Sequence, residues 1–196
     1  DGVVEIFLGD YVDRGPQSRQ VIDMLRADPS HDGERICLMG NHEDILLDFL
    51  DDPEILVLWL QNGGGPTLDS YGIVPPAEVG ASTMKTMRDQ LRDALGEQFG
   101  FLKGLKTSHI EGDYLFVHAG IRPGVALADQ DPQDLMWIRE AFLRHPGPHS
   151  HCVVHGHTPV DKPVVQRSRI DIDTGAVASG VLTCLVLEDE TRRFLA

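Results

Sequence analysis

The chain contains 196 residues, of which 41% are hydrophobic and 24% charged, enough for one compact domain with a buried core. Acidic residues outnumber basic ones by 31 to 17, and the net charge of -14 argues against binding to a nucleic-acid polymer. No apolar stretch approaches the roughly 20 residues of a membrane span, so no membrane partner is expected. The separated cysteines Cys37, Cys152 and Cys184 predict neither a disulfide framework nor a cysteine-rich zinc site, which favours a cytoplasmic location.

The chain begins at Asp1-Gly2 rather than at Met, and the first apolar run follows at once. We therefore expect a piece of a longer protein, forming a single domain over residues 1–196 that is incomplete at its N-terminus. Glycine and proline gather at the beginning of the stretch from 63 to 106. This stretch is predicted to be a variable insert or a cap-like segment.

Apolar, β-branched runs alternate with amphipathic stretches, which predicts an α/β fold. In chain order, the expected elements are strand Val3–Leu8, helix Ser18–Arg26, strand Arg35–Met39, helices Glu43–Leu50, Glu54–Leu60 and Thr83–Phe99, strand Tyr114–Val117, helix Asp134–Arg144, and strands Cys152–Val154, Ile170–Ile172 and Val181–Leu187. Trp59 and Trp137 are both expected in the core.

Polar clusters rich in Asp, Asn, His and Gly follow most of the predicted strands. In chain order they are Gly9-Asp10-Tyr11-Val12-Asp13-Arg14-Gly15, Gly40-Asn41-His42-Glu43, His118-Ala119-Gly120, His155-Gly156-His157-Thr158-Pro159 and Asp173-Thr174-Gly175. Ligands of open α/β sheets bind at the carboxyl ends of the strands. We therefore expect side chains from these clusters to form one site.

The candidate side chains combine carboxylate, amide oxygen and imidazole groups with an arginine. They are Asp10, Asp13, Arg14, Asn41, His42, His118, His155 and His157. Such donors without a thiolate suit manganese, iron or zinc. An arginine beside them offers a planar fork to a phosphate group. The set therefore points to metal-dependent hydrolysis of a phosphoester.

The Gly-Asp-Tyr-Val-Asp-Arg-Gly, Gly-Asn-His-Glu, His-Ala-Gly and Gly-His-Thr-Pro blocks resemble the phosphoprotein phosphatase branch of the calcineurin-like metallophosphoesterases, in that family's order. The tail Ile172-Asp173-Thr174-Gly175-Ala176 is similar to bacterial members of the branch. The resemblance implies an α/β/β/α sandwich of two mixed sheets. It also implies two divalent metals, with manganese expected and iron or zinc as alternatives.

By this resemblance, Asp10 bridges the two metals, and Asn41, His118 and His157 complete the second. The family holds its first metal with an Asp-x-His motif upstream, which the given chain lacks. Only the second metal therefore has its full ligand set here, and the first keeps only Asp10.

The resemblance also implies roles in catalysis. His42 is the general acid, Asp13 orients its imidazole, and Arg14 binds the substrate phosphate. Arg139 is a candidate second phosphate contact.

Plainer interpretations exist for most of these residues. Asp13 and Arg14 fit a surface turn, and Asn41 fits the N-cap of a helix. His118 fits a hydrogen-bonded core histidine, while His155 and His157 compete for one ligand role. The match to Gly-His-Thr-Pro favours His157 and makes His155 a strand residue beside the site.

The predicted function is that of a serine/threonine protein phosphatase, hydrolysing a phosphomonoester by direct attack of metal-bound hydroxide. Its partners would be a phosphorylated protein or a small phosphoester. One alternative is a diadenosine tetraphosphate (nucleotide) hydrolase with the same core. Another is a non-catalytic module that binds phosphorylated ligands, because the first-metal motif is absent.

Overall fold

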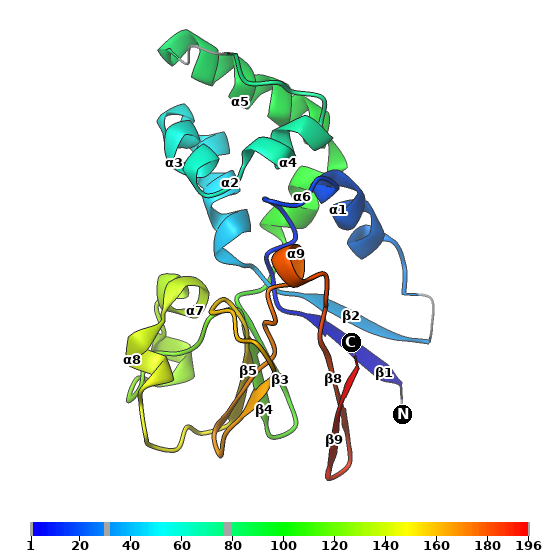
Figure 1. Cartoon of the computed structure of the whole chain (residues 1–196), viewed down its shortest axis with the longest axis vertical. Helices are drawn as coiled ribbons and strands as arrows, with labels where there is room; N and C mark the ends of the chain where they lie inside the picture. Colours follow the sequence, from blue (N-terminus) through cyan, green and yellow to red (C-terminus); the bar gives the residue numbers. More distant parts are fainter. Residues whose placement is uncertain (1, 30–31, 77–79, 196) are drawn as a thin grey trace. The chain divides into compact units, whose positions relative to one another are not determined.

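The computed structural model describes residues 2–29, 32–76 and 80–195. The chain divides into two compact units, Asp1–Lys106 and Thr107–Ala196, called unit 1 and unit 2 below (Figure 1).

Unit 1 contains two parallel strands, with one helix between them in the sequence and the other helices after them (Figure 1). Its elements are β1 (Val3–Phe7), α1 (Ser18–Arg26), β2 (Gly33–Cys37), α2 (Asn41–Asp51), the 3-10 helix η1 (Pro53–Ile55), α3 (Leu56–Gln61), α4 (Gly65–Ser70), α5 (Ala81–Leu95) and α6 (Glu97–Lys103). β1 and β2 are paired from Val3↔Gly33 to Phe7↔Cys37. Their carboxyl ends therefore lie at the same edge, where the loop 8–17 and the start of α2 follow.

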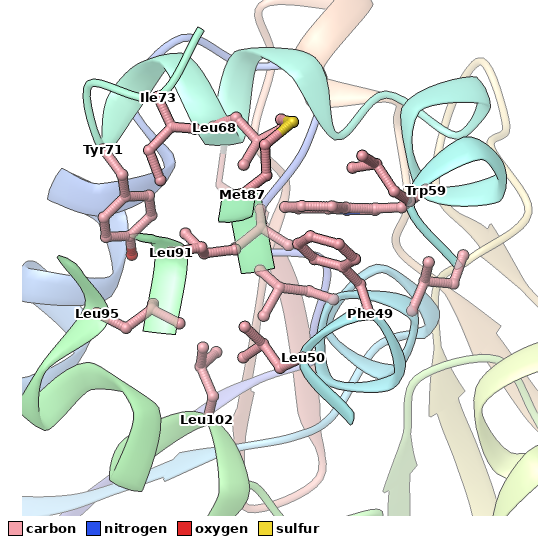
Figure 2. Close-up of a cluster of buried hydrophobic side chains, with 14 of the residues drawn as sticks. Phe49, Leu50, Trp59, Leu68, Tyr71, Ile73, Met87, Leu91, Leu95 and Leu102 are labelled. Carbon is pink, nitrogen blue, oxygen red and sulfur yellow. The ribbon is translucent and has the colours of Figure 1, made fainter. Parts of the chain in front are cut away.

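The helices of unit 1 bury one shared apolar core, shown in part in Figure 2. Phe49 of α2 stacks on Trp59 of α3 with ring centroids 5.1 Å apart, and Leu68 of α4 and Leu91 of α5 join them. Each of these four side chains is wholly excluded from solvent. Residues of the stretch 63–106 thus share a core with α2, which carries part of the predicted site.

Unit 2 is built on a mixed five-stranded sheet in the order β3-β4-β5-β7-β6. Its elements are β3 (Ser108–Glu111), β4 (Tyr114–Val117), η2 (Leu127–Asp129), α7 (Pro132–Trp137), α8 (Glu140–Leu143), β5 (Cys152–His155), β6 (Val164–Val165), β7 (Arg169–Asp171), α9 (Ala176–Ser179), β8 (Cys184–Glu188) and β9 (Thr191–Leu195). β4, β5 and β7 are parallel to one another, while β8 and β9 form a separate antiparallel pair. Leu115, Val153 and Phe142 lie in the core of this unit.

The predicted α/β class, with more than one sheet, is confirmed. Ser18–Arg26 and Tyr114–Val117 have the predicted bounds, and the other predicted strands lie within three residues of the observed ones. Cys37, Cys152 and Cys184 are free thiols. None of the helices described is long and apolar enough to span a membrane.

Two predicted helices are wrong as single elements. The helix expected over 83–99 ends at Leu95, because Gly96 adopts a φ of 53° and α6 begins anew. The helix expected over 134–144 is interrupted at Ile138 and Arg139, and Ile138 turns extended while its side chain enters the core. Trp137 at that break is 36% exposed, so its predicted place in the core is wrong.

Candidate functional site

The loop after β1 carries three predicted site residues in an unusual backbone conformation. Asp10, Asp13 and Arg14 have φ values of 62°, 73° and 63°. Non-glycine residues rarely adopt this left-handed region, and each such residue costs of order 1–3 kcal/mol. The surrounding structure must therefore hold the loop in place.

Glu43 is one group that holds it. Its Oε1 accepts hydrogen bonds from the amides of Tyr11 (2.6 Å) and Val12 (3.2 Å), and its Oε2 accepts from those of Asp10 (2.8 Å) and Gly40 (2.9 Å). Burial, together with the charge of Asp10, raises the pKa of Glu43 to about 7. Glu43 belongs to the Gly-Asn-His-Glu block but is not among the predicted site residues.

Gly40 lets the loop and the start of α2 approach closely. A Cβ atom at this position would lie 2.4 Å from Asp10 Oδ1 and 2.5 Å from the Asp10 amide nitrogen. Asp10 Oδ1 also accepts a hydrogen bond from the His42 amide at 3.3 Å. Gly40 is the N-cap of α2, so the reading of Asn41 as that cap is wrong, and Asn41 is instead the first helical residue.

His42 and Asp13 form a buried pair. His42 Nδ1 lies 2.7 Å from Asp13 Oδ2, and the Asp13 side chain is 0% exposed. A carboxylate only accepts, so the proton of this hydrogen bond sits on Nδ1. Nε2 is the ring nitrogen that does not contact Asp13. Burial lowers the pKa of His42, but the hydrogen bond that its ring donates to Asp13, together with the charges of Asp10 and Asp13, outweighs burial and raises the pKa above its usual value. A histidine so poised suits proton donation near neutral pH.

Two residues of the helical segment complete the surroundings of Asp13. The Trp59 indole N–H donates to Oδ1 at 3.0 Å and to Oδ2 at 3.1 Å, and the Thr67 hydroxyl donates to Oδ1 at 2.8 Å. Trp59 lies in the core, as predicted, and Thr67 is not among the predicted site residues. Trp59 is 46 positions from Asp13 in the sequence, and Thr67 is 54 positions from it. No local sequence pattern indicates contacts over such separations.

Arg14 presents its side chain to solvent. Its amide donates to the Gly63 carbonyl at 2.9 Å, which fixes the backbone. In the part of the chain that the structure describes, its guanidinium makes no hydrogen bond or ion pair. An exposed guanidinium on a fixed backbone is available to an anionic ligand.

In unit 2, His118 and His157 follow the parallel strands β4 and β5 and face each other. His118 Nε2 lies 3.3 Å from His157 Nδ1, and the two residues are 2% and 6% exposed. Two imidazole ligands of one tetrahedral metal, with bonds of about 2.0–2.1 Å, place their nitrogens about 3.3 Å apart. The pair therefore fits two ligands of one divalent metal. His157 has a φ of 66°, a further left-handed residue among the predicted site residues.

His155 has both ring nitrogens engaged within its own unit. Its Nε2 lies 3.2 Å from Arg169 Nη1, and its Nδ1 lies 3.2 Å from the Gly156 carbonyl. A guanidinium only donates, so Nε2 accepts and Nδ1 carries the proton. Burial lowers the pKa of His155 to about 4. A neutral ring with both positions used is poorly suited to bind metal, which favours His157 for that role.

Arg139, the candidate second phosphate contact, lies at the break between α7 and α8. It is exposed, and its Nη1 donates to the Thr158 hydroxyl at 3.2 Å, beside His157. Within each unit the structure thus gathers the predicted residues: Asp10, Asp13, Arg14, Asn41 and His42 in unit 1, and His118, Arg139 and His157 in unit 2.

Comparisons with known proteins identify similar chains. A family model for calcineurin-like phosphoesterases matches residues 2–180. A bis(5'-nucleosyl)-tetraphosphatase PrpE (asymmetrical) from Geobacillus sp. (strain WCH70) is 30% identical over 90% of this chain and 72% of its own length. The PrpE enzyme of Bacillus thuringiensis (strain Al Hakam) is 31% identical over 91% of this chain and 73% of its own length.

Solved structures share the fold. One described as a candidate diadenosine tetraphosphatase has a TM-score of 0.60 at 17% identity, and the match covers 97% of this chain and 78% of that chain. A metallophosphoesterase from Sphaerobacter thermophilus has a TM-score of 0.50 at 19% identity, covering 98% of this chain and 77% of that one.

Proposed function

Since this chain belongs to the calcineurin-like phosphoesterase family, we propose that it is a metal-dependent hydrolase of dinucleoside tetraphosphates. The relatives at about 30% identity carry names of that activity. The motifs alone favour a serine/threonine protein phosphatase, with the nucleotide hydrolase as the alternative. The names of the relatives support the nucleotide hydrolase.

The observation that carries the hydrolase proposal is the Asp13–His42 pair. A buried carboxylate 2.7 Å from an imidazole, with an exposed arginine next to it in sequence, suits hydrolysis of a phosphoester. Arg14 binds phosphoryl oxygens through its guanidinium fork. His42 donates the proton on Nε2 to the departing oxygen, and Asp13 keeps the ring oriented and stabilises its charge.

We assign Asp10, Asn41, His118 and His157 as ligands of one divalent metal, as the family resemblance implies. Their oxygen and imidazole donors suit manganese, iron or zinc. When bound, divalent metals lower the pKa of a coordinated water and polarise a phosphoryl oxygen. Arg139, whose donor group lies beside His157, is a second candidate for binding phosphate.

The nature of the leaving group separates the two substrate classes. Cleavage of a polyphosphate expels a phosphate group with a pKa of about 6, whereas a phosphoserine ester expels a far more basic alkoxide. Loss of the general acid His42 therefore costs less on the dinucleotide than on the phosphopeptide. This difference tests the role of His42 as general acid, whereas the rates distinguish the substrate classes.

The test compares kcat/KM for diadenosine tetraphosphate and a phosphoserine peptide with manganese present. We expect the dinucleotide to be preferred, and Asp10→Asn to reduce both metal content and turnover. Preference for the phosphopeptide would restore the protein phosphatase interpretation. Binding of the dinucleotide without hydrolysis of either substrate would instead indicate a non-catalytic module.

A further inference from the structure

The corner between α3 and α4 lies directly against the Asp13–Arg14 backbone. Three of its groups contact that turn: the Trp59 indole, the Thr67 hydroxyl and the Gly63 carbonyl. A Cβ on the next residue, Gly64, would lie 2.5 Å from the Trp59 ring. The Trp59 ring is therefore packed directly against the backbone of Gly64. The corner begins in α3, just before the predicted insert 63–106, and extends into that insert through α4.

Counting protons fixes the direction of the Thr67 hydroxyl. Its oxygen accepts from the Asp13 amide at 2.8 Å and lies 3.0 Å from the Ser18 hydroxyl. A hydroxyl has one proton to donate and two lone pairs to accept with. Since the Thr67 proton goes to Asp13 Oδ1, Ser18 must donate to Thr67, and every position on the Thr67 oxygen is used.

The Asp13 carboxylate depends on these donors. Its side chain is fully buried, so water cannot solvate it, and a buried anion requires hydrogen bonds from the protein. His42 supplies one donor, and Trp59 and Thr67 supply the others. Stacking on Phe49 explains why the Trp59 ring is buried, but it does not explain why the indole N–H is directed at Asp13.

We infer that Trp59 and Thr67 are positioning residues for the hydrolysis proposed above: by holding the Asp13 carboxylate, they keep the His42 proton on Nδ1 and the Nε2 position directed at the leaving group. This inference rests on the proposed function for its kinetic consequence. The hydrogen bonds themselves lie within unit 1.

The matched variants are Thr67→Val, which keeps the shape and removes the hydroxyl, and Thr67→Ser, which keeps the hydroxyl. Ser18→Ala is the control, because it removes a hydrogen bond of the same network but leaves the Thr67 hydroxyl on Asp13. Urea denaturation of each variant measures its folding. Trp59→Phe is a second, independent variant that removes the other donor.

The kinetic readout compares phenyl phosphate with p-nitrophenyl phosphate under manganese. Phenolate, with a pKa of about 10 like tyrosine, needs a general acid, whereas p-nitrophenolate leaves readily without one. Thr67→Val should lower the ratio of kcat values, phenyl to p-nitrophenyl, about tenfold, as expected for one lost hydrogen bond to a charged group. Thr67→Ser and Ser18→Ala should keep the ratio. In an Asp13→Asn background, Thr67→Val should change it no further.

The second readout does not depend on activity. At a pH above the pKa of His42, where the ring is neutral, its ¹⁵N shifts should report a single Nδ1–H form in the wild type and a mixture of both neutral forms in Thr67→Val. Equal loss of both hydrolyses with unchanged ¹⁵N shifts would overturn the inference and leave Thr67 a folding role only. If the wild type hydrolyses no phosphoester, the proposed function fails, and the ¹⁵N shifts alone decide the positioning.

Discussion

Glu43→Gln tests whether one side chain holds the strained loop of unit 1. Glu43 accepts four backbone hydrogen bonds, two on each carboxylate oxygen, at distances of 2.6 to 3.2 Å. Glutamine has almost the same shape but replaces one oxygen with an NH₂ group, which can only donate. Whichever way the glutamine amide turns, its NH₂ group replaces an oxygen that accepts two hydrogen bonds. Two backbone N–H groups then face another donor instead of an acceptor.

The size of the effect follows from these contacts. Hydrogen bonds to a charged group contribute about 1.5–3 kcal/mol each, so two lost bonds cost at least about 3 kcal/mol. The variant no longer buries a carboxylate, which offsets part of that cost. We expect unit 1 to lose about 2 kcal/mol of unfolding free energy. Metal binding should weaken as well, because Glu43 holds the amide of Asp10.

The two tryptophans make the measurement specific to unit 1, because Trp59 lies in unit 1 and Trp137 in unit 2. In a Trp137→Phe background, urea denaturation followed by fluorescence reports the surroundings of Trp59. Asp48→Asn, on an exposed position of the same helix, is the control and should change stability by less than about 0.5 kcal/mol. A loss for Glu43→Gln as small as that of the control, with unchanged manganese affinity, would refute the role of Glu43.

Three further outcomes are expected. His42→Ala should lower phosphomonoester turnover by about two to four orders of magnitude, while metal content, measured by elemental analysis, stays constant; loss of metal would show that His42 is a ligand. Burial raises the pKa of Asp171 to about 7, so its carboxylate destabilises the fold increasingly as pH rises through that value. Asp171→Asn should therefore melt higher than the wild type at pH 8, with an advantage that shrinks towards pH 4; a constant difference would contradict this. Gly120→Ala should destabilise unit 2 by about 1–3 kcal/mol in denaturation, because its Cβ would lie 2.3 Å from the Phe142 ring, and the φ of 155° adds strain.

The sequence predicts the parts of the site that depend on strand ends. Parallel pairing brings the end of β1 beside the end of β2, and that of β4 beside that of β5. The residues after each strand must then lie at one edge. This is why the residues after these strands could be predicted to form one site. The pairing of Asp13 with His42, and of His118 with His157, is implied by the family resemblance instead.

The supports of the site could not be predicted in the same way. Trp59 and Thr67 reach Asp13 because α3 packs on α2 and α4 packs on α1, and this packing is decided by the whole core rather than by a local pattern. A tryptophan in an apolar helix is predicted to lie in the core, and the sequence does not indicate which group its indole N–H contacts. The break in the helix expected over 134–144 has a similar origin, since Ile138 and Phe142 both enter the core of unit 2.

Of the five non-glycine residues with positive φ in the described part of the chain, four are predicted site residues: Asp10, Asp13, Arg14 and His157. For the three in unit 1 the combined strain is of order 3–9 kcal/mol, comparable to the stability of a small domain. Their backbone is held by the carboxylate of Glu43, by Thr67 and by the carbonyl of Gly63, all on elements that share one helical core. A core mutation that loosens α3 or α4 should therefore release this loop before the unit unfolds, and activity should fall at denaturant concentrations where Trp59 is still buried. If activity and the Trp59 fluorescence signal are lost at the same denaturant concentration, the loop is released only when unit 1 unfolds, and the prediction is wrong.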